Sequence, residues 1–314
     1  MSCLPALIAY ALLLGLTFVP ASGVRSADPV TLKIATLASD TGADVYYAQA
    51  QGFFKAAGLD VEINALGSGP AVISAVAAGS YDFGAANPVS IAEAHLHGIP
   101  ILIVAPGAIH VKGIPDDGLM LPQASTIKTA RDLEGKTIAV TTIGGLGALA
   151  LRTWITKNGG DVKAVKFTEI PYPAMAAALE GGRFDGAVMT EPFITGAKPR
   201  VKPFIDAYDT IADRFLIDGW VSSEGWLGKH PDEARRFISA MRAAHEWANA
   251  HQPETAVILV KNTKIDPQIA STMARAQFGL ALDPALVQPV LDLASKSGQF
   301  DRPLSAGDLI WKPK

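Results

Sequence analysis

Small polar residues and glycines gather in five short segments of the sequence. The segments are LASDTG (37–42), GSGP (67–70), ANPVS (86–90), TTIGGLG (141–147) and TEPF (190–193). Their hydroxyl and amide groups can donate hydrogen bonds, and their glycines let a ligand come close to the backbone. Any one segment is also typical of an ordinary turn or helix cap. Five together favour a site that binds a small polar solute through neutral donors.

The sequence contains no recognisable catalytic motif. Neither G-x-S-x-G nor H-E-x-x-H occurs, and the six histidines are scattered along the chain. GLGALA at 145–150 matches the G-x-G-x-x-A fingerprint of dinucleotide sites, with Glu169 further along, but a single match of this kind is weak evidence. We therefore expect a binding protein with no catalytic residue, no metal and no cofactor.

The first residues have the composition of a secretory signal peptide. Residues 4–19 are apolar or small and carry no charge, and they are shorter than the ~20 residues that a membrane-spanning helix needs. We expect residues 1–23 to be the signal peptide, with cleavage between 21 and 27 and a periplasmic mature protein; an uncleaved anchor is the alternative. Cys3, the only cysteine, would leave with the peptide, so no disulfide is expected.

Length and charge narrow the class of protein further. About 290 residues would remain after cleavage, a length that fits two lobes better than one small core. The formal net charge is −3 and the basic residues form no dense cluster, so nucleic acid is not an expected partner. We expect a monomer.

A pattern of four features occurs twice in the chain, with an offset of about 104 residues. The four features are a strand running into a polar loop, an alternating strand, a proline at a helix start, and a Gly-x-aromatic-Asp turn before another strand. The two copies are 30–42, 59–66, Pro70 and 79–82, then 136–147, 164–171, Pro173 and 182–185. The repeat predicts two similar βαβαβ lobes, each with a mostly parallel sheet covered by helices and joined by right-handed crossovers.

The rest of the pattern predicts how the lobes are assembled. Residues 44–58 favour one helix that ends at Gly58, and after residue 220 helix follows helix. We expect the first lobe to comprise 28–108 and 219–314, with the extra C-terminal helices packed largely on it, and the second lobe to comprise 109–218. Ligands of open parallel sheets bind beyond the carboxyl ends of the strands, which is where the five polar segments lie.

Three acidic residues lie in or beside these segments. Glu191 follows an expected strand and could accept a hydrogen bond from a ligand amine or amide, or it could bind backbone N–H groups as a structural carboxylate. Asp40 and Asp44 could likewise either accept a hydrogen bond from a ligand or act as structural carboxylates. Any of them facing the cleft would make a simple anion such as nitrate less suitable than a zwitterion or a polar heterocycle.

Several of these stretches carry a family resemblance. YYAQAQGFFKAAGLDVEINALGSGPAVISAVAAGSYDFGAANPVSIAEAHLHGIPILIVA, then IKTARDLEGKTIAV and AAALEGGRFDGAVMTEPF, resemble the periplasmic solute-binding proteins of ABC importers. The similarity is greatest to the nitrate, sulfonate, taurine and thiamine-pyrimidine-precursor group, over about residues 30–260. It implies an α/β fold of the type II periplasmic-binding-protein class, with two lobes joined by two hinge strands, and a permease with its ATPase as partners.

The resemblance also implies which residues bind the ligand, by the position of the group's binding loops. They are Ser39, Asp40, Thr41, Gly42, Ser68, Gly69, Asn87, Ser90, Thr141, Thr142, Gly144, Gly145, Thr190 and Glu191. Because no convergent Arg or Lys is identifiable, we expect a small organic anion or zwitterion, with sulfonates such as taurine the leading class. Alternatives are a pyrimidine precursor or another small aromatic solute, or an enzyme on the same fold.

Overall fold

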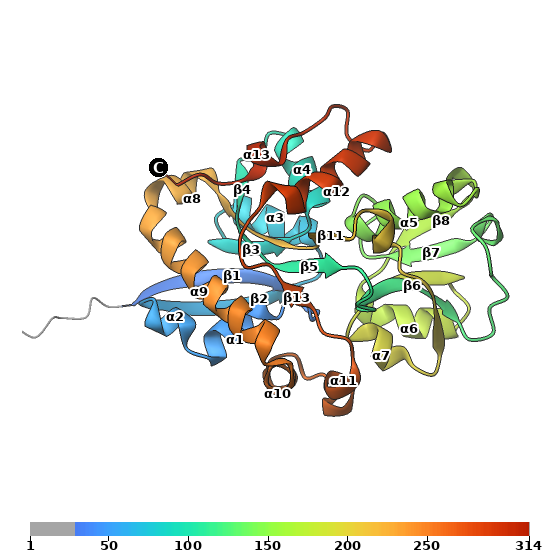
Figure 1. Cartoon of the computed structure of the whole chain (residues 1–314), viewed down its shortest axis with the longest axis horizontal. Helices are drawn as coiled ribbons and strands as arrows, with labels where there is room; N and C mark the ends of the chain where they lie inside the picture. Colours follow the sequence, from blue (N-terminus) through green and yellow to red (C-terminus); the bar gives the residue numbers. More distant parts are fainter. Residues whose placement is uncertain (1–28, 314) are drawn as a thin grey trace, which may run out of the picture.

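The computed structural model describes residues 29–313. The predicted signal peptide, its cleavage region and Cys3 therefore lie outside the described residues. Within the described range, no helix combines the length and the apolar character needed to cross a bilayer. The described chain forms two lobes that lie side by side along the longest axis of the molecule (Figure 1).

Each lobe is built on a five-stranded sheet, and the two sheets have equivalent strand orders. The first runs β2 (Leu59–Leu66), β1 (Val30–Leu37), β3 (Phe83–Ala86), β12 (Gly219–Ser223), β4 (Ile101–Pro106). The second runs β8 (Lys166–Glu169), β7 (Thr137–Val140), β9 (Gly186–Thr190), β6 (Asp117–Pro122), β10 (Val201–Ile205). One strand of each sheet, β12 or β6, is antiparallel to both its neighbours, and the other pairs are parallel. The expected mostly parallel α/β fold is confirmed.

The two sheets also share their register. Ile34 of β1 pairs with Ile63 of β2, and Ile138 of β7 pairs with Phe167 of β8. Ile138 follows Ile34 by 104 residues, and Phe167 follows Ile63 by the same number. The repeat in the sequence is therefore a repeat of structure, with equivalent residues at equivalent places in the two sheets.

A third, small sheet connects the lobes. Its order is β11 (Arg214–Leu216), β5 (Ala108–Val111), β13 (Gln277–Phe278), and all its pairs are antiparallel. The chain leaves the first lobe along β5, which lies between the lobes in Figure 1, and comes back along β11. The sequence predicts two connecting strands; the structure adds a third, which the C-terminal region supplies. The lobe boundaries at 108/109 and 218/219 remain a proposal.

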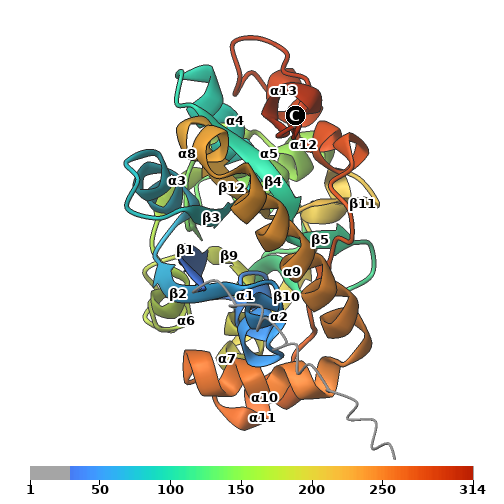
Figure 2. The same ribbon diagram turned by 90° about the vertical axis from the view of Figure 1, so that its left-hand side faces the viewer.

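Helices cover the faces of both sheets (Figures 1 and 2). In the first lobe these are α1 (Asp44–Ala50), α2 (Phe53–Ala56), α3 (Gly69–Ala77), α4 (Pro88–Leu96), α8 (Glu224–Lys229), α9 (Pro231–Ala250), α10 (Gln252–Thr263), α11 (Pro267–Thr272), α12 (Pro284–Lys296) and α13 (Ala306–Leu309). In the second they are α5 (Leu146–Lys157), α6 (Tyr172–Glu180) and α7 (Phe193–Ala197), with the short 3-10 turns η1 (Arg131–Leu133), η2 (Val162–Ala164) and η3 (Tyr208–Thr210). The C-terminal helix α9 packs on α1 and α2, whereas α11 also contacts α7 of the second lobe.

The single helix expected over 44–58 is wrong. The structure has two short helices, α1 and α2, because Gly52 between them adopts a left-handed backbone with φ 75°. That conformation ends a right-handed helix and suits glycine, which has no Cβ to clash. Gly58, where the expected helix ends, does have the predicted left-handed conformation.

Buried polar contacts tie the C-terminal region to the first lobe. Asp44 at the start of α1 accepts hydrogen bonds from Trp220 Nε1 and from His245 Nε2, each at 2.8 Å, and all three side chains are almost fully buried. His245 Nδ1 lies 2.8 Å from the carbonyl oxygen of Gly279. Asp44 therefore has its partners inside the lobe, which favours the structural reading of this acid.

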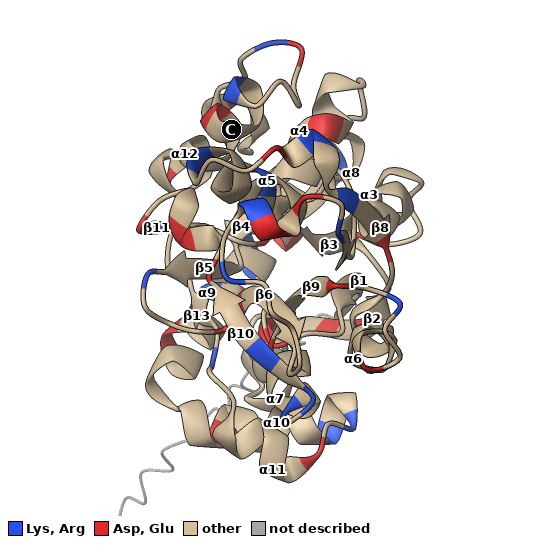
Figure 3. Cartoon of the chain, turned by 90° about the vertical axis from the view of Figure 1, so that its right-hand side faces the viewer, with Lys and Arg blue, Asp and Glu red and all other residues tan. Residues whose placement is uncertain are grey.

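Figure 3 shows Lys, Arg, Asp and Glu spread over one face of the molecule.

Candidate functional site

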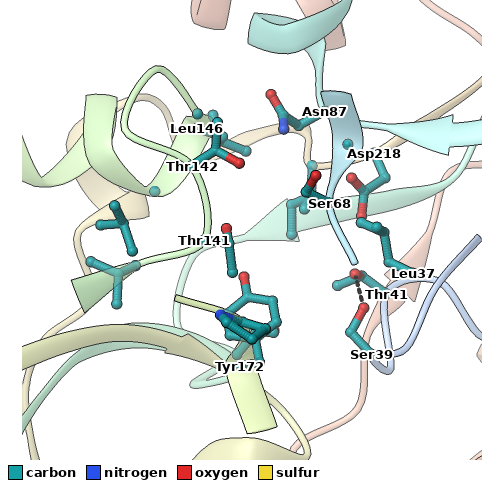
Figure 4. Close-up of a pocket in the computed structure, with 18 of the residues that line it drawn as sticks. Leu37, Ser39, Thr41, Ser68, Asn87, Thr141, Thr142, Leu146, Tyr172 and Asp218 are labelled. Carbon is teal, nitrogen blue, oxygen red and sulfur yellow. Dashed lines mark hydrogen bonds between the residues drawn. The ribbon is translucent and has the colours of Figure 1, made fainter. Parts of the chain in front are cut away.

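A cavity of about 190 Å³ lies between the two lobes. Both lobes contribute to its wall, mostly through residues just beyond the carboxyl ends of parallel strands, as expected for open α/β sheets. Figure 4 shows Ser39, Thr41 and Ser68 on one side of the cavity and Thr141, Thr142 and Leu146 across from them. The lining residues are 37–39, 41, 66–69, 87, 117, 140–142, 145–148, 171–173, 188, 190, 193, 208, 217 and 218.

On the first-lobe side, the polar residues are also helix caps. The Ser68 hydroxyl oxygen accepts from Ala71 N at the start of α3, and the Asn87 side-chain oxygen accepts from Ser90 N at the start of α4. Such caps satisfy backbone donors that the helix leaves free. They also fix the two side chains at the cavity wall, and the Ser68 hydroxyl proton remains able to donate to a ligand.

On the second-lobe side, the start of α5 faces the cavity without a cap. Gly145 is the N-cap residue and has no side chain to accept from the first turn, and residues 145–148 all line the cavity. The first intrahelical bond donor is Leu149 N, which donates to Gly145 O. The N–H groups of residues 146–148, which come before Leu149 in the first turn, have no acceptor within the helix. Together with the positive end of the helix dipole, they favour an anionic group here. Thr141 and Thr142 add hydroxyls beside them.

Two acidic residues line the cavity close to the lobe connections. The side chains of Asp117 and Asp218 are buried, with exposed fractions of 6% and 4% for the residues. Burial raises the pKa of Asp218 to about 6, opposed by the Thr41 hydroxyl and assisted by the Asp44 carboxylate. Burial also raises the pKa of Asp117 well above its usual range, and the neighbouring Asp116 and Asp206 carboxylates add to the rise.

Aromatic rings complete the wall. Tyr172 stacks on Phe193 with ring centroids 5.3 Å apart and an interplanar angle of 17°, and both line the cavity. Burial raises the pKa of the Tyr172 hydroxyl, as do the carboxylates of Asp117 and Asp218. Tyr208, a third aromatic lining residue, lies edge-on to Phe215. The cavity therefore combines neutral donors, an apolar wall and two acids.

Nine of the fourteen residues predicted for the site line the cavity. They are Ser39, Thr41, Ser68, Gly69, Asn87, Thr141, Thr142, Gly145 and Thr190. The other five, Asp40, Gly42, Ser90, Gly144 and Glu191, lie next to the lining residues but are not among them. Whether any of the fourteen contacts a ligand stays a prediction.

The two predicted acids outside the lining have partners within the protein. Asp40 accepts from the Arg275 guanidinium, at 2.8 Å from Nη2, and from Ala276 N at 2.7 Å. Glu191 accepts from the Thr195 hydroxyl at 2.7 Å and from Thr195 N at 3.0 Å. Both contacts fit the reading of these acids as structural carboxylates.

The three other predicted residues outside the lining, Gly42, Ser90 and Gly144, also have contacts within the protein. A Cβ on Gly42 would lie 2.6 Å from Leu37 O, so this glycine allows the first loop to fold tightly. The Ser90 hydroxyl accepts from the Asn87 side-chain nitrogen at 3.2 Å. Gly144 O accepts from Gln299 Nε2 at 2.6 Å.

Hydrogen bonds join the two lobes on either side of the cavity. Asp40 N of the first lobe donates to Glu191 O of the second at 3.2 Å. On the other side, Gln299 Nε2 donates to Glu93 Oε1 of α4 at 2.8 Å as well as to Gly144 O. The two lobes are therefore in direct hydrogen-bonded contact at two places.

Sequence reasoning missed Asp117 and Asp218 because it considered only the ends of parallel strands. Asp117 is the first residue of β6 and Asp218 precedes β12, the two strands that run antiparallel to their neighbours. The start of an antiparallel strand lies at the same sheet edge as the ends of its neighbours. A sequence signal for both acids does exist. Each is an aspartate at the point where the chain, having crossed from one lobe, begins its first strand in the sheet of the other lobe.

Comparisons with known proteins identify the family of the chain and several similar proteins. The family model described as NMT1/THI5 like matches residues 41–256. A putative binding protein of Brucella abortus is 23% identical over 269 residues, which cover 84% of this chain and 81% of that protein.

Solved structures share the fold at low identity. The alkanesulfonate-binding protein SsuA from Xanthomonas axonopodis, bound to MOPS, has a TM-score of 0.76 at 16% identity, covering 91% of this chain and 99% of that one. The periplasmic nitrate-binding protein NrtA from Synechocystis also has a TM-score of 0.76 at 16% identity, covering 87% and 83%. The desulfurization enzyme DszB has a TM-score of 0.66 at 16% identity, covering 90% and 96%. Because the family model spans more than half of the chain, this chain belongs to the NMT1/THI5-like family.

Proposed function

We propose that the protein is the extracytoplasmic solute-binding subunit of an ABC importer. It captures a small organic anion or zwitterion between its lobes and delivers it to a permease and its ATPase. Sulfonates of the taurine type are the leading class of solute. The single observation that carries this proposal is the cavity between the lobes, which is lined by the uncapped start of α5 and by hydroxyl-bearing residues of both lobes.

The donors suit a sulfonate group without any basic side chain. A sulfonate has three acceptor oxygens, and preorganised N–H and O–H donors bind a charged oxygen strongly. We propose that Thr141, Thr142, Ser68 and Asn87, with the N–H groups of the first turn of α5, share those oxygens. The Brucella and Xanthomonas relatives, both described as binding proteins, support binding rather than catalysis.

A small aromatic solute is the second candidate. Tyr172 and Phe193 form a flat apolar wall, and the adjacent carboxylates could accept from ring amino groups. A pyrimidine precursor would use these features and would depend less on the start of α5.

A thermal-shift panel of taurine, ethanesulfonate, nitrate, an aromatic carboxylate and an aminopyrimidine separates the candidates. A ligand at 100 times its Kd stabilises the protein by about 2.7 kcal/mol. A shift with sulfonates supports the leading class, whereas a shift with the aminopyrimidine alone overturns it. Mass spectrometry of the solute after incubation distinguishes binding from catalysis, because a binding protein returns it unchanged.

A further inference from the structure

We propose that Asp117 and Asp218 form a joint binding site for a positively charged group, so that the natural solute carries a protonated amine or an amidine-like cation. This inference rests on the proposed solute-binding function and narrows its ligand class. The two residues are called the acid pair below.

The acid pair occupies equivalent places in the two lobes. Asp117 precedes Gly118, which pairs with Met189 of β9, and Asp218 precedes Gly219, which pairs with Ala86 of β3. Each of the two sheets therefore has one aspartate at the start of its antiparallel strand or directly before it, and both residues line the cavity and are more than nine-tenths buried. A group bound by both acids would bridge the lobes.

No basic side chain compensates these acids at the cavity wall. The described residues that line the cavity include no Lys, Arg or His, and Asp117 and Asp218 are the only carboxylic acids among them. Arg275 is not among the lining residues, and its guanidinium donates to Asp40 and to the Tyr47 hydroxyl. A buried carboxylate without a cation costs free energy, which a cationic ligand group would recover.

The acid pair also has an unused acceptor. Within the described part of the chain, Asp117 Oδ2 is buried and has no hydrogen-bond partner. Buried acceptors are nearly always satisfied in folded proteins, so this lining residue keeps one acceptor for a donor that arrives with the ligand, once the carboxyl group turns that oxygen toward the cavity. An ammonium or amidinium group supplies charge and several N–H donors at once.

The cavity wall beside the acid pair suits the apolar part of such a solute. Tyr172 lies close enough to both acids for each carboxylate to raise the pKa of its hydroxyl. Its ring stacks on Phe193. Aromatic rings next to carboxylates attract organic cations through their faces as well as their apolar surface. The start of α5 remains available for an anionic group of the same solute, which favours a zwitterion over a simple anion such as nitrate.

In one alternative, both residues of the acid pair are protonated and neutral. Because burial raises the pKa of both acids, they could stay protonated and donate hydrogen bonds to an anion. The two states differ in their response to pH: affinity for a cation falls on acidification, whereas affinity for an anion held by protonated acids rises. The other titratable groups that act on the pair or lie beside it are Asp116, Asp206, Asp44, Tyr172 and Tyr208.

Matched solutes that differ only by amine and hydroxyl test the proposal. Calorimetry would compare taurine with 2-hydroxyethanesulfonate, β-alanine with 3-hydroxypropionate, and propylamine with propanol. We expect the amine to bind about 100-fold more tightly in at least one pair, as for a desolvated charge pair, and its affinity to fall between pH 8 and pH 5. Binding by hydroxyl members alone, or equal binding within every pair, would overturn the acid pair as a cation site and leave the proposed function standing.

Variants of the acid pair complete the test. D117N and D218N should each weaken the amine at least about tenfold and leave the hydroxyl analogue within about twofold, whereas the exposed-surface control D232N should change neither. Circular dichroism checks that each variant is folded. Unchanged amine binding in both acid-pair variants would contradict the proposal. No binding by any of the six solutes would overturn the proposed function itself, and the cation site with it.

Discussion

Replacing Asp218 by Asn should stabilise the ligand-free protein at neutral pH. The native pKa of Asp218 is about 6, against 3.8 for an unperturbed aspartate. Each pKa unit corresponds to about 1.4 kcal/mol, so ionising this buried acid costs the native state roughly 3 kcal/mol at pH 7.5. The native state binds the proton more tightly than the unfolded state does, so the cost disappears as the pH falls from about 6 through the unfolded value. The amide of Asn cannot ionise and avoids the cost at every pH.

Urea unfolding followed by tryptophan fluorescence measures this effect in solute-free protein. The stability advantage of D218N over the natural protein should be roughly 2 kcal/mol larger at pH 7.5 than at pH 4.5, where about 1 kcal/mol of the ionisation cost remains. Comparing the two pH values removes any constant difference between Asn and protonated Asp. The control D232N, at an exposed site, should show no such change. An advantage of the same size at both pH values would refute the assignment of a raised pKa to Asp218.

Other substitutions test other parts of the structure. Q299A removes the side chain that joins Gly144 O to Glu93, and it should weaken solute binding by roughly 1–3 kcal/mol, mainly through faster dissociation in stopped-flow measurements. G52A forces an alanine into a left-handed backbone with open space around it, and it should lower the free energy of unfolding by about 1–2 kcal/mol without altering solute affinity. T141A should weaken the bound solute by about 0.5–3 kcal/mol in calorimetry, and unchanged affinity would remove Thr141 from the site.

The sequence predicted the fold well because its signals are local and repeated. The alternating strand over 59–66, Pro70 and Pro173 at helix starts, and glycines such as Gly58 that end helices all act within a few residues. Their recurrence at a constant offset made each copy evidence for the other. The break at Gly52 was missed because an isolated glycine inside a helical pattern is tolerated and does not by itself mark the end of a helix.

The sequence predicted the part of the cavity wall that follows parallel strands, and it missed the part at the start of the antiparallel strands. Loops after parallel strands, such as those with Ser68 and Thr141, could be placed from strand order alone. Asp117 and Asp218 were missed because nothing within a few residues shows that β6 and β12 run antiparallel. Their direction depends on the strands between which they insert, so only a reading of the whole topology could have pointed to an aspartate at the start of each. The C-terminal strand β13 was likewise unpredictable, because two residues carry no periodic signal.

The position of β12 has a consequence for the order in which the lobes can form. β12 lies between β3 and β4 in the first sheet, yet it follows β4 in the chain by more than a hundred residues, so β4 has no strand neighbour in its sheet until residue 219 has been made. In the second sheet, β6 precedes both of its neighbours, and the whole sheet is contained in 117–205. Sequence-distant pairing is slow to form, so the second lobe should fold as an early unit and the first should close late. A chain arranged in this way keeps the sheet of its first lobe incomplete until about two thirds of its residues have been made, while the second lobe already holds all five strands of its own sheet.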